Sequence, residues 1–347
     1  MAQPTVMTVR GPVPADELGI TLAHEHLFFR LDCYYSQAED DPDGSFAAGP
    51  ITPDRLWWLR SHPFNSRVNL VQEDLATAVW EVEQFKAGGG TTIIDVTTVG
   101  ISPNPAGLVA VSERTGLHIV AGTGYYLAAS YADHAAMDQS TEELADEMRG
   151  ALMEGMHGTN VRAGLMGELG VSNPPEPVEL RVLAAAAQVQ RELDYAINIH
   201  PAWYRAGAET AVQAVEAAGI EPRRTMISHL DVRFLDDLPA YKELARRGYW
   251  LSLDTFGREM YYPHANIQFP SDAQRIQVVL GLLEAGYGDR LLLAQDICFR
   301  TDLVRYGGHG YAHLLRTLRS RFLKAGVSAE TFDSILTDNP RRFLCGE

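Results

Sequence analysis

Short apolar segments alternate with longer amphipathic segments along almost the whole chain. The short segments are rich in Val, Ile and Leu, as strands are when helices cover one face of a parallel sheet and packed side chains cover the other. Several of the long segments end in glycine, for instance Gly116, Gly219 and Gly248, which is typical of a helix terminus. The pattern predicts eight strands, at residues 20–29, 91–98, 118–126, 162–170, 195–200, 225–231, 249–256 and 291–297.

Eight strand-helix units favour a closed (β/α)₈ barrel, a distorted TIM barrel, over an open doubly wound sheet. No glycine-rich phosphate fingerprint follows the first strand, which argues against a dinucleotide fold. We expect one barrel domain over residues 1–347, with a strand-turn-strand lead-in at 1–19 and a long insertion at 30–69. Such an insertion serves as a lid, a binding loop or an oligomer contact. Alternatively, Trp57 and Trp58 simply pin a short surface helix.

The composition narrows the class of protein. Of the 347 residues, 46% are hydrophobic and 21% are charged, the balance of a globular protein with a large core. A net charge of −16 argues against nucleic-acid or anionic-membrane partners. No uninterrupted apolar run reaches the roughly 18 residues of a membrane span, the N-terminus lacks the layout of a secretory signal, and three cysteines cannot form a disulfide framework. We expect a cytoplasmic protein that acts on a small molecule.

Residues of the types that bind metals stand at the ends of five predicted strands, where barrel enzymes place their reacting groups. The first strand ends in His24-Glu25-His26. Because side chains two apart in a strand share a face, His24 and His26 point one way and Glu25 the other. One such residue is usually a hydrogen-bonded core residue, but five strand ends together indicate a metal centre. The other four ends carry Glu168, His200, His229 and Asp296.

The size of this set predicts two metal ions, because a catalytic zinc ion typically uses only three protein ligands. We expect zinc, although the same ligands accept Mn²⁺, Co²⁺ or Fe²⁺. Two divalent cations contribute +4 and two carboxylates with a hydroxide −3, which leaves about +1, a charge that suits a developing oxyanion. We assign one ion to His24, His26 and Asp296 and the other to His200 and His229, with Glu168 and the hydroxide as bridges.

This arrangement predicts a metal-dependent hydrolase. Paired metals supply hydroxide near neutral pH to attack a carbonyl carbon or a phosphorus, and Asp296 is positioned to pass the proton to the leaving group. The chain has no GxSxG nucleophile elbow, and Cys298 has no neighbouring histidine. A mononuclear deaminase would need an acid shortly after His200, and residues 201–204 include none. A non-catalytic binding protein would tolerate loss of some of the six ligands. All six positions hold residues that can coordinate a metal, which argues against such a protein.

Several strings of sequence carry a family resemblance. The segments ITLAHEHL, GELG, NIHP, MISHLD and AQD, in this order, resemble the phosphotriesterase family of the amidohydrolase superfamily. The strings LDCYY, SHPFNSRVNL, HIVAGTGYY and RYGGHGY are most similar to its phosphotriesterase-related branch, which includes an animal N-acetyltaurine amidohydrolase. The resemblance implies a homodimeric barrel with a binuclear zinc or similar site, the same six ligands, and Asp296 as the proton acceptor. Many members bridge the metals with a carboxylated lysine; here Glu168 takes that place, as in the related branch.

The substrate expected from this resemblance is an amide or carboxylic ester with an anionic group, such as an N-acylated amino sulfonate or amino acid. A lactonase is the close alternative. Weak phosphotriesterase or organophosphate hydrolysis is less favoured because it accompanies the bridging lysine. An arginine on the facing loops could hold a sulfonate or carboxylate with two hydrogen bonds. We expect Asp254 to be a buried hydrogen-bonded residue rather than a ligand. The candidate substrate contacts are Tyr125, Tyr126, Arg258 and Arg300.

Overall fold

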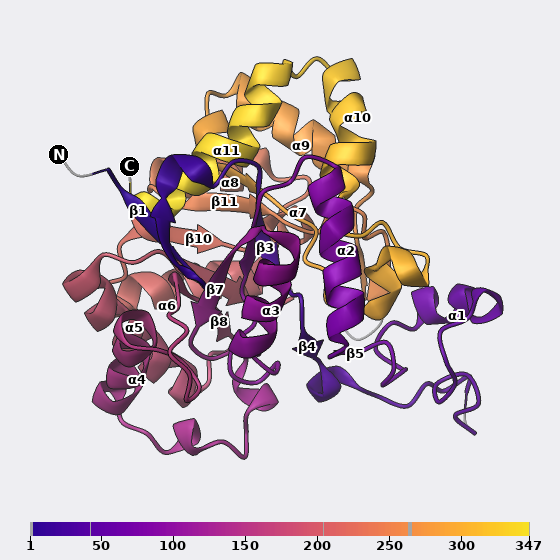
Figure 1. Ribbon diagram of the computed structural model, residues 1–347, viewed down its shortest axis with the longest axis horizontal. Coiled ribbons are helices and arrows are strands. Elements are labelled where there is room, and N and C mark those ends of the chain that lie inside the picture. The colour runs from indigo at the N-terminus through magenta and orange to yellow at the C-terminus, as the bar shows by residue number, and fades with distance from the viewer. Residues whose placement is uncertain (1–2, 42, 204, 263–265, 347) are drawn as a thin grey trace.

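The computed structural model describes residues 3–41, 43–203, 205–262 and 266–346. Eight parallel strands form one sheet that curves into a nearly closed barrel, with helices packed around it (Figure 1). Neighbouring strands follow the order of the chain, which confirms the predicted (β/α)₈ class. These strands are β3 (Thr21–Glu25), β6 (Thr92–Asp95), β7 (His118–Thr123), β8 (Leu165–Val171), β9 (Ile197–Pro201), β10 (Thr225–Ile227), β11 (Trp250–Leu253) and β14 (Leu291–Leu293).

The helices that cover the sheet begin and end at residues that suit those positions. Helix α3, for example, starts at Pro105 under an Asn104 cap and ends before Gly116, which has φ = +77° as the sequence predicts. The larger helices are α2 (Leu75–Ala87), α3 (Pro105–Thr115), α4 (Thr141–Met153), α5 (Pro177–Leu193), α6 (Arg205–Ala218), α8 (Leu238–Arg246), α9 (Asp272–Glu284) and α11 (Ala329–Cys345). Short helices α1 (Leu56–Ser61), α7 (Leu230–Arg233) and α10 (Arg319–Lys324) lie between them.

One core cluster contains inward-facing residues of the strands and closes the end of the barrel opposite the site described below. The antiparallel pair β1 (Thr5–Thr8) and β2 (Gly11–Pro14) forms the predicted lead-in. Its Val6, together with Leu18 and Phe343 of α11, joins buried residues from the strands. Figure 1 shows α11 lying beside β1, with both chain ends on the same side. The strand residues of this cluster include Ala23, Ile94, Val120, Leu165, Met226, Trp250 and Leu292.

All eight strands are shorter than the sequence predicted, and two of them end before the ligand-type residue assigned to their ends. The sixth ends at Ile227 rather than at residue 231, and the eighth at Leu293 rather than at residue 297. His229 and Asp296 have φ values of +57° and +51°, and a residue in this left-handed region cannot continue a strand. Both side chains therefore project from turns just beyond the strands.

The insertion is tied to the barrel by a short antiparallel pair, β4 (Phe29–Arg30) and β5 (Val71–Gln72). Within it, the Trp58 ring stacks on Phe46 and His62, with ring centroids 5.7 and 4.6 Å apart. Trp58 is 1% exposed, whereas the adjacent Trp57 is 63% exposed. Of the two tryptophans it is Trp58 that anchors α1, together with the buried Leu59, and the helix extends from the side of the barrel (Figure 1).

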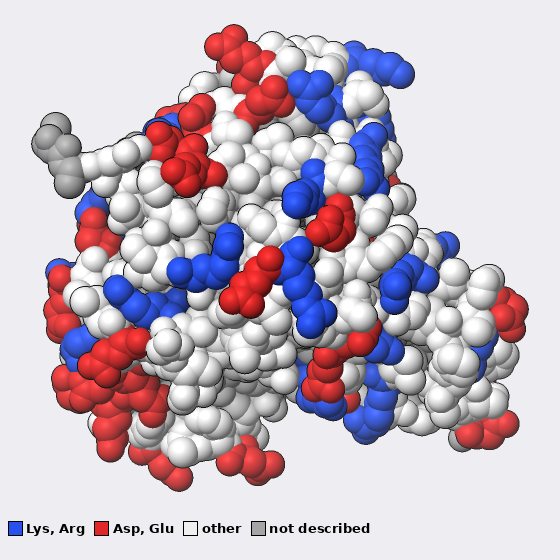
Figure 2. Space-filling model, viewed as in Figure 1, with Lys and Arg blue, Asp and Glu red and all other residues white. Residues whose placement is uncertain are grey.

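Acidic side chains gather on one part of the surface in the view of Figure 2, over α4 at the lower left. The exposed Glu142, Glu143, Asp146 and Glu147 lie on this helix. Elsewhere in this view acidic and basic side chains are interspersed. Among the described residues, no helix has the combined length and apolar character needed to cross a bilayer.

The two adjacent tryptophans provide a stability test with a built-in control. We expect Trp58→Ala to lower the free energy of unfolding by about 3 kcal/mol, because it leaves a cavity among packed rings. Trp57→Ala is expected to change it by less than about 0.5 kcal/mol, as at other exposed positions. Urea unfolding followed by circular dichroism measures both values. Equal losses in the two variants would contradict the anchoring role of Trp58.

Candidate metal centre

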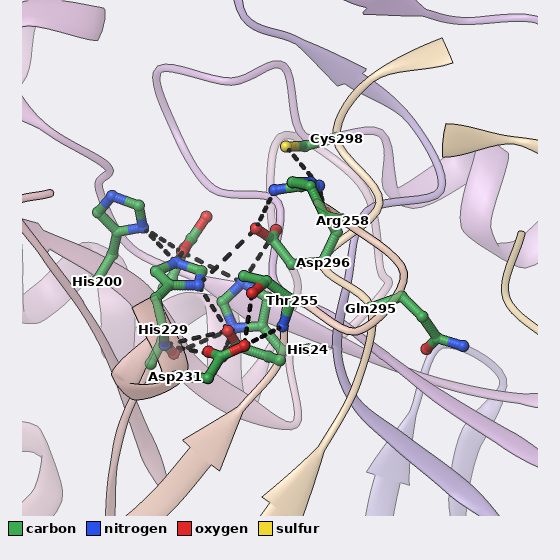
Figure 3. A network of polar contacts seen from close by, with 12 residues as sticks. His24, His200, His229, Asp231, Thr255, Arg258, Gln295, Asp296 and Cys298 are labelled. Atoms are coloured by element: carbon green, nitrogen blue, oxygen red, sulfur yellow. Dashed lines mark hydrogen bonds and ion pairs between the residues drawn. The ribbon is translucent and has the colours of Figure 1, made fainter. Parts of the chain in front are cut away.

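The six ligand-type side chains predicted from the sequence meet at the carboxyl end of the barrel. His24 lies within β3 and His26 just after it, Glu168 lies in β8, and His200 in β9. All six are buried, with at most 4% of each residue exposed. Figure 3 shows His24, His200, His229 and Asp296 directed toward one another, whereas Gln295 points away.

The first histidine pair faces both carboxylates. His24 Nε2 lies 3.4 Å from Glu168 Oε2 and 3.6 Å from Asp296 Oδ1. His26 Nε2 lies 3.4 Å from Glu168 Oε1 and 3.4 Å from Asp296 Oδ1. Ligand atoms bound about 2.0–2.2 Å from one zinc ion are separated by distances of this order.

The second histidine pair faces Oε2 of Glu168, the oxygen that His24 also faces. His200 Nδ1 is 2.9 Å from Glu168 Oε2 and 2.9 Å from His229 Nε2. His229 Nε2 is 3.8 Å from the same carboxylate oxygen. Glu168 is therefore common to two groups that could hold a metal ion, His24–His26–Glu168 and Glu168–His200–His229.

Partners on neighbouring strands leave one nitrogen of each ring directed at the centre. The Thr97 hydroxyl donates to the Phe28 carbonyl, so it accepts from His26 Nδ1, 2.9 Å away. His229 Nδ1 donates to Asp254 Oδ1 at 2.7 Å. In both rings Nε2 then faces the centre, where a metal ion would bind it. Asp254, which also accepts the backbone N–H of His229, thus has the hydrogen-bonded environment expected of it.

His24 provides a direct test of whether a cation fits this centre. Its Nδ1 lies 2.9 Å from Asn198 Nδ2 and 3.1 Å from Ser228 Oγ. Its Nε2 is buried without a hydrogen-bond partner, although it points at two carboxylates. A buried polar nitrogen is normally paired, and a divalent cation among these nitrogen and oxygen atoms would pair it. The six residues therefore fit a metal centre.

The pKa values of His200 and His229, the two members of the second histidine pair, are shifted in opposite directions. Burial lowers the pKa of His200 to about 4. Burial also disfavours the charged form of His229, but the carboxylates of Asp254 and Asp296 raise its pKa to about 10. Although burial favours the neutral form of Glu168, the imidazoles of His200 and His24 hold its pKa well below the usual range. Glu168 is therefore a carboxylate, and His200 is a neutral imidazole at pH 7.

Arg258 holds the far side of Asp296. Its Nη1 donates to Asp296 Oδ2 at 2.9 Å, and its Nη2 donates to Asp302 Oδ2 at 2.9 Å and to the Asp296 carbonyl (Figure 3). Burial opposes the charge on Asp296, yet Arg258 and His229 keep the pKa of this carboxyl well below its usual range. Arg258, predicted as a substrate contact, thus has its guanidinium on Asp296.

A small chamber, with a cavity volume of about 20 Å³, lies against the centre. The insertion contributes Leu31, Tyr34 and Phe64 to its wall. Of the four predicted substrate contacts, Tyr126 lines it; its hydroxyl is 3.1 Å from His200 Nε2 and 2.9 Å from the Tyr34 hydroxyl. No lysine or arginine is among the described residues that line it. The remaining lining residues are His26, Phe29, Ile101, Glu168, His200, Trp203, Asp296, Cys298 and Phe299.

Tyr125 and Arg300 lie elsewhere. The Tyr125 hydroxyl bonds to Glu147 on α4, and the Arg300 guanidinium lies 5.4 Å from the centre of the Tyr306 ring. Thr97, Asn198 and Ser228, which contact the histidines, are not predicted from the sequence. Only their positions in the sequence could have indicated this role. Asn198 stands two residues before His200, and Ser228 stands one residue before His229.

Comparison with known proteins agrees with this geometry. The sequence profile of the phosphotriesterase family matches residues 4–344. The N-acetyltaurine hydrolase of Salmo salar is 36% identical, over 98% of this chain and 97% of its own length. The structure of a resiniferatoxin-binding protein from Rhodobacter sphaeroides superposes with a TM-score of 0.95 at 35% identity, covering 99% of this chain and 95% of its own.

A variant of a PTE-like lactonase from Deinococcus radiodurans superposes with a TM-score of 0.73 at 28% identity, covering 98% of this chain and 100% of its own. These matches extend over almost the whole chain and agree with the motifs at the strand ends. The chain is a hydrolase that belongs to the phosphotriesterase family.

Proposed function

We propose that this chain is a binuclear metal-dependent hydrolase that cleaves an amide or carboxylic ester bond of a small N-acyl compound with an anionic group. The observation that carries the proposal is the position of Glu168, whose carboxylate is shared by four histidines: Oε1 faces His26, and Oε2 faces His24, His200 and His229. The relative from Salmo salar, named an N-acetyltaurine hydrolase, supports this substrate class.

The six residues would hold two divalent ions, for which we propose Zn²⁺. Such ions would lower the pKa of bound water and polarise a carbonyl oxygen. The chain itself supplies the two carboxylates that offset their charge and the oriented imidazoles. Arg258 donates to Asp296 Oδ2, which leaves Oδ1 facing His24 and His26. The Asp296 carboxylate would take up a proton and return it to the leaving group.

The wall of the chamber supplies orientation and excludes water. Phe64, Trp203 and Phe299 enclose the space next to the ligands, which strengthens electrostatic interactions inside it. The Tyr126 hydroxyl, held between His200 and Tyr34, is a polar group that can orient a bound carbonyl compound.

Lactone opening is a second candidate, favoured by one observation. The described residues lining the chamber include no cation to pair with a sulfonate or carboxylate. A neutral lactone needs no such partner, and its hydrolysis also proceeds through an oxyanion. The likeness to a lactonase supports this alternative.

Metal analysis tests the two-ion centre. We expect the reconstituted parent to retain about two zinc ions per chain, as two-metal hydrolases do, and Glu168→Ala at most one, because the shared carboxylate is lost. The control is Glu142→Ala, which removes an exposed carboxylate on α4. Since Glu168 needs no carboxylation, activity after reconstitution is expected to be independent of bicarbonate. One ion in the parent, or a strong bicarbonate requirement, would contradict the proposal.

A substrate panel separates the two candidate functions. N-acetyltaurine, N-acetyl amino acids and simple lactones are compared at one fixed zinc concentration. We expect the highest kcat/KM with an anionic N-acyl compound. Turnover of lactones alone would reject the amide version and favour the alternative.

Arg258→Met distinguishes an electrostatic partner of Asp296 from a substrate contact. We expect kcat to fall about 100-fold for anionic and neutral substrates alike, because the variant leaves Asp296 Oδ2 buried without its partner. Arg300→Met, on the neighbouring loop, is expected to leave kcat unchanged. A rise in KM confined to anionic substrates would instead assign Arg258 to substrate binding.

A further inference from the structure

The barrel sheet has two ends, β3 and β14, and no strand ladder joins them among the described residues. A side chain connects their carboxyl ends instead. Glu25, the last residue of β3, is fully buried. Its Oε1 accepts the backbone N–H of Gln295 at 2.7 Å, and its Oε2 accepts that of Ile297 at 3.0 Å. One carboxylate thus makes the hydrogen bonds that strand pairing makes between the other neighbours.

The two amides that Glu25 binds lie on either side of Asp296. The Asp296 carbonyl accepts from Arg258, so the backbone is held before, at and after this residue. Asp296 needs this support, because its φ of +51° is uncommon for a residue with a side chain. In this conformation its Oδ1 faces His24 and His26.

Glu25 also stands between those two histidines in β3. Alternation along the strand sends the two imidazoles to one face and the carboxylate to the other. We propose that Glu25 is a positioning residue that fixes Asp296 relative to His24 and His26, and so sets the affinity of the metal site that these three residues form. This role rests on the metal centre proposed above. If Glu25 only closed the barrel, its loss would lower the stability of the protein without weakening one metal site more than the other.

Glu81 offers a matched control for that distinction. It is also fully buried, and it also binds two backbone amides: Oε2 accepts from Val304 at 3.2 Å and Oε1 from Arg305 at 2.9 Å. It supports the loop after β14 without bonding to either neighbour of Asp296. In both positions Glu→Gln replaces an acceptor oxygen with an NH₂ group that cannot accept an N–H.

The test is zinc titration of the metal-stripped full chain against a competing chelator, together with the melting temperature of the stripped protein. Glu25→Gln is expected to lose about tenfold or more in affinity at one of two sites, the usual effect of removing a group that orients a ligand. Glu81→Gln is expected to keep both affinities, while both variants melt at a lower temperature than the parent. Parent-like affinity in Glu25→Gln, or an equal loss in Glu81→Gln, would overturn the proposal.

A second comparison tests whether Glu25 acts through Asp296. In an Asp296→Asn background, Glu25→Gln should cause no further loss of zinc affinity, since the residue to be positioned is already changed. An additive loss would overturn the proposed route. Should Glu25→Gln fail to fold, Glu25→Asp keeps the charge on a shorter side chain, and it should weaken the same site. If the parent chain binds no zinc, the proposed metal centre is wrong. If the parent binds two zinc ions and Glu25→Gln binds them equally well, only the role of Glu25 is wrong.

Discussion

A buried negative charge dominates the carboxyl end of this barrel. Glu168 is a carboxylate in an interior where an unpaired charge is costly, and the groups that face it most closely are four imidazoles. Those imidazoles can compensate the charge by carrying protons or by binding cations through their nitrogen lone pairs. Burial lowers the pKa of His200, so this ring offers a nitrogen lone pair to a cation. Asp254 and Asp296 raise the pKa of His229 and favour a proton there, which a bound cation would displace.

Orientation of the rings depends on residues from several strands. Thr97 follows β6, Asn198 lies in β9, Ser228 follows β10 and Asp254 follows β11, and each contacts a histidine of another segment. The fold brings these pairs together because parallel strands all end at the same edge. The geometry of the centre is therefore a property of the closed barrel rather than of any one motif.

Much of this could be predicted from the sequence. Alternating strand and helix patterns predicted the barrel, and the polar residues at the strand ends predicted which side chains would meet. The patterns could not show that His229 and Asp296 have positive φ values, because a residue other than glycine in this conformation leaves no signal in the hydrophobic pattern. They also could not distinguish the arginines. Arg258 and Arg300 both follow strands, but only the three-dimensional arrangement puts the Arg258 guanidinium on Asp296.

The insertion between β4 and β5 combines two features that are usually separate. It has a small packed centre of its own around Trp58 and Phe46, and it also contributes Tyr34 and Phe64 to the wall of the chamber. The part of the protein that shapes the cavity is thus stabilised apart from the strands that carry the ligands. Substitutions there can alter which acyl groups are admitted while the chemistry of the centre stays intact, which gives a phosphotriesterase-family barrel a route to new specificity.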